Sequence, residues 1–118
     1  MLLDLHPEPR RNPVTVRTSA GTTSVGALEY SESFIQTIAA ANHALAALEQ
    51  ERVFVREQQT EYEVLNHFDS DAAWRTYMEA EAQYFAPPDA AMLNSIERAP
   101  GEILMTEWIR GTRFRRSG

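Results

Sequence analysis

Apolar side chains recur at alternating spacings of four and three residues in the segment that follows Ser31. On a helix of 3.6 residues per turn, such positions form one stripe along a single face. Ser31 or Ser33 is suited to begin the helix, because a serine hydroxyl accepts a hydrogen bond from a free N–H of the first turn. The pattern predicts one long helix from Ser31 to Glu51, with a stripe made of Phe34, Ile38, Ala41, Leu45 and Leu48.

Several other segments have the composition and alternation of strands. Val14–Thr18 and Ser24–Leu28 are short runs on either side of a turn that contains Gly21, and they predict a hairpin. From Val53 to His67, apolar and polar residues alternate, as in a strand with one polar face. A final strand is predicted from Glu102 to about Phe114.

Two shorter helices are predicted between the last two strands. The first begins near Asp69–Asp71, where the side chains can cap a helix, and Pro87–Pro88 ends it. The second continues until Pro100–Gly101. The apolar residues of the two helices are Trp74, Tyr77, Met78 and Phe85 in the first, and Met92, Leu93 and Ile96 in the second.

The chain opens with a short apolar run, Leu2 to Leu5, which Pro7 terminates. Such a run is typical of a strand that is covered on both faces, as in parallel sheets. The whole pattern predicts an α+β fold with a small mixed sheet, one long helix and two short helices, in the order β-ββ-α-β-α-α-β. An opening strand with apolar residues on both faces leaves surface to be covered, so we expect a homodimer or a second polypeptide as partner.

Composition narrows the class of protein. A length of 118 residues without an internal repeat indicates a single domain, residues 1–118. The absence of cysteine excludes disulfides and thiolate chemistry, and the net charge of −6 disfavours nucleic acid as a partner. The first residues lack the pattern of a signal peptide, and no apolar stretch approaches the roughly 20 residues of a membrane span. We therefore expect a cytoplasmic protein that does not bind a membrane.

All 11 basic residues are arginine, and the last of them crowd the C-terminus. We expect residues 110–118 to form an arginine-rich tail on an acidic body. Such a tail is either solvated or in contact with an anion or an acidic partner.

Four residues are candidates for a pocket: His6, Tyr62, His67 and Trp108. His6 follows the first strand, where it is either a pocket residue acting as a general base or a loop histidine bonded to the backbone. His67 precedes Asp69, which either orients the imidazole or caps the next helix. The histidines lack metal-ligand spacing, and no residue has a complete catalytic motif around it. We therefore predict no metal site and assign no catalytic residue.

Three stretches of the sequence, 2–7, 62–70 and 101–113, together with the hairpin and the long helix, carry a family resemblance. They resemble the C-terminal part of bacterial class I S-adenosylmethionine-dependent methyltransferases. The resemblance implies that 2–6 is the fifth strand of that fold, 31–51 the following helix, and 53–67 and 102–114 the antiparallel sixth and seventh strands.

The cofactor-binding half of that family has no counterpart in this chain. Its five glycines include no G-x-G spacing, so the turn that cradles the cofactor is missing. We expect no cofactor to bind the isolated chain, and S-adenosylmethionine only when a cofactor-binding partner is present. Whether the chain is an enzyme therefore stays open. The resemblance implies a methyltransferase-like domain without catalysis of its own, and the alternatives are a dimeric small-molecule-binding module and a protein-interaction module.

Overall fold

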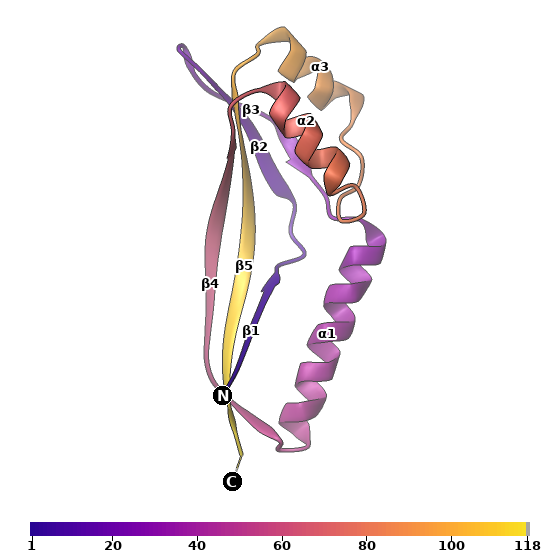
Figure 1. Cartoon of the computed structure of the whole chain (residues 1–118), viewed down its shortest axis with the longest axis vertical. Helices are drawn as coiled ribbons and strands as arrows, with labels where there is room; N and C mark the ends of the chain where they lie inside the picture. The colour runs from indigo at the N-terminus through magenta and orange to yellow at the C-terminus, as the bar shows by residue number, and fades with distance from the viewer. Residues whose placement is uncertain (118) are drawn as a thin grey trace.

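The computed structural model describes residues 1–117. It confirms the α+β class and the predicted order, with one long and two short helices (Figure 1). The elements are β1 (Leu2–Pro7), β2 (Asn12–Thr18), β3 (Gly21–Leu28), α1 (Glu32–Gln50), β4 (Phe54–Phe68), α2 (Asp71–Ala80), α3 (Ala90–Arg98) and β5 (Glu102–Arg116). No helix within residues 1–117 is both long enough and apolar enough to cross a membrane.

Each helix begins at a capping side chain. Ser31 Oγ accepts a hydrogen bond from the N–H of Phe34 at 3.3 Å, which satisfies a donor of the first turn of α1. Ser70 and Asp89 cap α2 and α3 in the same way. These caps explain why the predicted start of α1 is correct to one residue.

The end of α2 differs from the prediction. The helix stops at Ala80, seven residues before Pro87. The next residues turn back instead, because the N–H of Ser31 donates to the carbonyl of Tyr84 at 2.8 Å. Phe85 therefore lies in the connection between the two helices and not on the face of α2.

β5 is the central strand of the sheet. It pairs with β4 along one edge, and with β1 and then β2 along the other, while β3 lies outside β2. Every one of these pairings within residues 1–117 is antiparallel, so the sheet is antiparallel and not mixed.

The prediction that β1 is covered on both faces is wrong. β1 pairs only with β5 and lies at the edge of the sheet, where the side chains of Leu3 and Leu5 are 62% and 57% exposed. The next strand in the chain, β2, pairs with the same edge of β5 further along, and it does not pair with β1. The apolar surface expected for β1 is therefore present, but it is a face of the sheet that solvent reaches.

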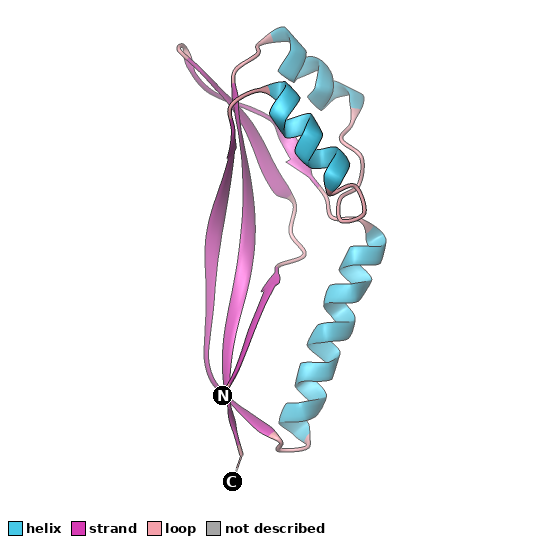
Figure 2. Ribbon diagram, in the orientation of Figure 1, coloured by secondary structure: helices cyan, strands magenta, loops and turns pink. Residues whose placement is uncertain are grey.

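The β4–β5 ribbon twists between its two ends. Ile103 and Met105 are buried at one end of β5, whereas Thr112 and Phe114 are buried at the other. Successive residues of a strand point to opposite faces. The odd-numbered residues of β5 therefore face the core at one end and the even-numbered residues at the other, and the change falls between Met105 and Thr112. The twist lets all three helices lie along one side of the ribbon (Figure 2).

The twist divides the molecule into two parts. We call β2, β3, α2, α3 and the adjoining ends of β4 and β5 the head, and β1, α1 and the remaining length of β4 and β5 the arm. The head holds the main core, in which Val14, Val16, Trp74 and Ile96 pack with Ile103 and Met105. In α1, only Ile38 is buried.

The shape leaves much surface exposed. The molecule measures 59 × 27 × 19 Å, and its radius of gyration is 17.7 Å. A compact domain of this length has a radius of gyration of about 13.5 Å. The accessible surface is 7473 Å², and a compact monomer of this mass exposes about 6,500 Å².

The arginine-rich segment is not a free tail. Residues 110–116 belong to β5. The guanidinium groups of Arg113 and Arg115 lie 3.1 and 3.5 Å from the carboxylate of Glu57 on β4, which partly neutralises them.

Candidate functional site

A cavity of about 340 Å³ lies where the first turn of α1, the end of α2 and the middle of β5 meet. Aromatic side chains form most of its wall: Tyr30, Phe34, Tyr77, Tyr84 and Phe85. Two carboxylates, those of Glu81 and Glu107, complete the lining with Pro7. We call this cavity the aromatic pocket.

Backbone hydrogen bonds hold the pocket wall in place. The segments around Tyr30 and Phe85 form an isolated antiparallel bridge, and the N–H of Ala86 donates to the carbonyl of Glu29 at 2.8 Å. The Tyr30 and Phe85 rings stack with centroids 5.2 Å apart. Phe34 and Tyr84 meet edge to face at 5.0 Å. The pocket is therefore formed before any ligand arrives.

Glu107 contributes a charge that is held by two hydrogen bonds. The hydroxyl of Tyr30 donates to its Oε2 at 2.6 Å, and Asn66 Nδ2 donates to its Oε1 at 2.9 Å. Because both oxygens accept hydrogen bonds, the arrangement suits the ionised carboxylate. Its surroundings are apolar rings, which screen charge poorly compared with water.

Two tyrosines of the pocket, Tyr30 and Tyr77, have raised pKa values. Burial raises the pKa of Tyr30, and the hydrogen bond and the charge of Glu107 raise it further. Burial also raises the pKa of Tyr77 to about 12, with further contributions from the charges of Glu107 and Glu81. Both carboxylates therefore act electrostatically at the Tyr77 hydroxyl, and the pocket has a negative interior.

His6, the first residue predicted for a pocket, is part of a different cluster. Its Nδ1 lies 2.5 Å from Asp4 Oδ2, and Arg110 Nη2 donates to its Nε2 at 2.8 Å. Arg110 also donates to Asn42 on α1, and its Nε lies 3.2 Å from Glu8 Oε1. Since arginine can only donate, Nε2 must be the acceptor and Nδ1 must carry the proton. Both nitrogens are occupied, so this cluster joins β1, β5 and α1 and leaves no free base.

Of the other three predicted residues, only His67 lies far from His6, whereas Trp108 and Ile109, the residue that pairs with Tyr62, are within two residues of Arg110, which pairs with His6. His67 and His6 pair with Leu104 and Arg110 of β5, which are six residues apart and thus separated by about 20 Å. The ring of Trp108 lies under the guanidinium of Arg10, 5.3 Å from it. Tyr62 is 43% exposed on the outer face of the arm.

His67 lies in a group that resembles a cation site. One ligand atom each from His67, Asp69 and Glu102 falls within 4.8 Å of the others. However, Arg17 Nε donates to Glu102 Oε2 at 2.7 Å. This bond, followed by one from His67, lowers the pKa of Glu102. The arginine already supplies the positive charge that these exposed carboxylates attract, so the group is better described as an ion-pair network.

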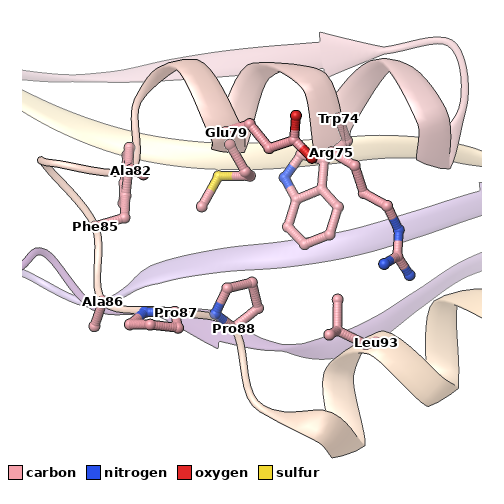
Figure 3. Close-up of a pocket in the computed structure, with 10 residues that line it drawn as sticks. Trp74, Arg75, Glu79, Ala82, Phe85, Ala86, Pro87, Pro88 and Leu93 are labelled. Carbon is pink, nitrogen blue, oxygen red and sulfur yellow. The ribbon is translucent and has the colours of Figure 1, made fainter.

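A second cavity, of about 310 Å³, separates α2 from α3. Its wall on α2 includes Trp74 and Met78, and the indole of Trp74 points toward Pro88 and Leu93 on the other side (Figure 3). Arg75 Nη2 and Glu97 Oε1, 3.2 Å apart, join the two helices nearby. Two charged residues, Arg75 and Glu79, also line the groove, and Arg75 is already bound to Asp71 and Glu97.

The sequence contained one unused signal for the aromatic pocket. Glu107 is on the same pleat of β5 as the apolar residues Ile103 and Met105, and a carboxylate on a buried pleat requires partners. Tyr30 and Phe34 carry no such signal, because their spacing is also that of ordinary core residues. Comparisons with known proteins found no match to any family model, curated protein or solved structure.

Proposed function

We propose that this protein is a small-molecule-binding module that works as a homodimer and has no catalytic activity of its own. The observation that carries the proposal is the aromatic pocket with Glu107 in its wall. Ligand sites are typically preformed, apolar cavities of about 300–1,000 Å³ with a few convergent polar groups. The pocket matches this description, and the hydroxyl of Tyr30 and the carboxylate of Glu107 are held by hydrogen bonds. We also propose that the protein is cytoplasmic, because a chain without cysteine has no need of an oxidising compartment.

A screen of small-molecule fragments against ¹⁵N-labelled protein tests the proposal. We expect hits that shift the amide signals of residues 30–34 and 77–85, which contribute most of the pocket wall. Tyr84→Leu should weaken these hits about 5- to 10-fold, because it removes an aromatic face worth about 1 kcal/mol. Tyr84→Phe keeps the ring and should leave them unchanged. The proposal is wrong if no fragment perturbs these residues, or if both Tyr84 variants behave alike.

The outer face of the arm supports the dimer. Leu3, Leu5 and Tyr62 are exposed there, around Gly111 of β5. A Cβ at Gly111 would lie 3.1 Å from Leu5 Cδ2, so the side chain of Leu5 packs over this glycine. A depression of about 230 Å³, whose lining includes Leu3, Gly111 and Arg113, lies on the same face. One face thus carries both protruding leucines and a depression, and such a face can be complementary to itself across a two-fold axis.

A methyltransferase-like domain is the second candidate. The observation in its favour is that β4 and β5 form an antiparallel pair beside β1, as the resemblance implies for the last strands of that fold. On this proposal, a second chain that carries a glycine-rich strand–turn–helix, encoded in a neighbouring reading frame, supplies the cofactor site.

Calorimetric titration with S-adenosylmethionine tests this candidate. The isolated chain should give no binding heat, because no glycine-rich turn cradles the ribose and the carboxylate. The mixture with the partner chain should bind. Micromolar affinity of the isolated chain, or a mixture that fails to bind, would contradict the proposal that a second chain supplies the cofactor site.

A further inference from the structure

We infer that the ligand of the aromatic pocket is a small organic cation that carries an alkylated ammonium group. This inference rests on the proposed function and specifies its ligand class. Three features of the described residues carry it: the sign of the charges in the wall, the aromatic faces left available, and the state of the Glu107 oxygens.

The charge of the pocket has one sign. Its lining residues include two glutamates and no arginine or histidine. Glu81 forms no ion pair within residues 1–117, so its charge is not neutralised locally. Between residues 69 and 97 the chain has six acidic residues and a single arginine, Arg75, which is itself bound to Asp71 and Glu97. An anionic ligand would be repelled, and a neutral one would leave both carboxylates without a counter-charge.

The aromatic rings are only partly used by internal packing. Tyr30 and Phe85 are buried, whereas Phe34, Tyr77 and Tyr84 are half-buried and keep part of their surface toward the cavity. The faces of aromatic rings carry negative charge density and attract cations. Several such faces around one cavity suit a cation whose charge is spread over methyl groups.

The state of Glu107 argues against a metal ion. Its two oxygens already accept hydrogen bonds from Tyr30 and Asn66. A hard cation such as Mg²⁺ or Ca²⁺ requires about six or more close oxygen ligands. The pocket offers aromatic rings and the negative charge of two carboxylates instead. A quaternary ammonium group, which has no N–H donors, interacts favourably with both.

Choline and its neutral carbon isostere, 3,3-dimethylbutan-1-ol, test the inference on the full chain. Both probes have the same shape, so a difference in affinity reports the positive charge. In ¹⁵N NMR titrations, choline should shift residues 30–34 and 77–85, and it should bind at least 10-fold more tightly than the alcohol. Equal affinities would overturn the inference while leaving a small-molecule pocket in place. Failure of choline to shift these residues would also overturn it, and the fragment screen would decide separately whether the pocket binds any ligand.

Two glutamates at the end of α2, two residues apart, provide a matched pair of variants. Glu81 lines the aromatic pocket, whereas Glu79 lines the groove between α2 and α3. Glu81→Gln should weaken choline at least 3-fold and leave the alcohol unchanged. Glu79→Gln changes the net charge equally and should alter neither. Equal effects of the two variants would mean that choline responds only to overall acidity, and this would overturn the inference.

Discussion

Replacement of Trp74 by alanine is expected to lower the free energy of unfolding by about 3–5 kcal/mol. Trp74 is 1% exposed and packs in the core of the head against β2 and β5. Alanine would leave a cavity between α2 and the sheet, which the twisted ribbon cannot close because its inward pleat is already filled by Ile103 and Met105. Urea unfolding followed by circular dichroism measures the loss without relying on tryptophan fluorescence.

Trp74→Phe is the informative control. The indole Nε1 of Trp74 is buried and has no hydrogen-bond partner within residues 1–117. An unpartnered buried donor costs about 1–3 kcal/mol, and phenylalanine removes it together with part of the packing volume. The two effects oppose each other, so we expect a net loss below about 1.5 kcal/mol. A loss as large as that of the alanine variant would contradict this account and indicate that the N–H has a partner, such as a buried water.

Local patterns were sufficient for most of the secondary structure. The stripe from Phe34 to Leu48 and the cap at Ser31 predicted α1, and alternation predicted β4 and the hairpin. Helix and strand periods depend on neighbouring residues alone, which is why one sequence was enough. The end of α2 was missed because proline gives only the last possible residue of a helix. The actual end depends on the bond between Ser31 and Tyr84, which are 53 positions apart in the chain.

The opening strand was misjudged for a different reason. Apolar residues at Leu2, Leu3 and Leu5 show that both faces of the strand need cover, but not what supplies it. The inner face packs toward α1, whereas the outer face has no cover within residues 1–117. A sequence pattern cannot distinguish cover by the same chain from cover by another one.

The aromatic pocket could not be predicted because it depends on long-range contacts. Tyr30 meets Glu107 across 77 positions and Phe85 across 55. Each of these residues has an ordinary environment in the sequence. The twist of the β4–β5 ribbon also decided that Glu107 faces the helices and not solvent. Conversely, His6 and His67 had suggestive neighbours in the sequence, but the structure binds both imidazoles into ion-pair networks.

Leu5→Glu is expected to convert a homodimer into a monomer and to raise the dimer dissociation constant at least 100-fold. The surface of one chain exceeds that of a compact monomer by about 1,000 Å², and a standard interface buries about 800 Å² per partner. The exposed leucines of the arm are the part of this excess surface that is best suited to a dimer contact. A carboxylate placed among them would have to be desolvated without a partner, which costs several kcal/mol. Sedimentation velocity at 1–100 µM, a range of about two decades that brackets typical dimer affinities, measures the change.

Leu65→Glu is the matched control, because Leu65 is 61% exposed but pairs with Thr106, five residues along β5 from Gly111 and thus about 17 Å away. The same charge placed there should leave the dimer intact. Thermal unfolding should show that both variants remain folded, since neither leucine belongs to the buried core. If the unmodified chain sediments as a monomer throughout the range, or if Leu65→Glu dissociates the dimer as strongly as Leu5→Glu, the arm is not the contact face.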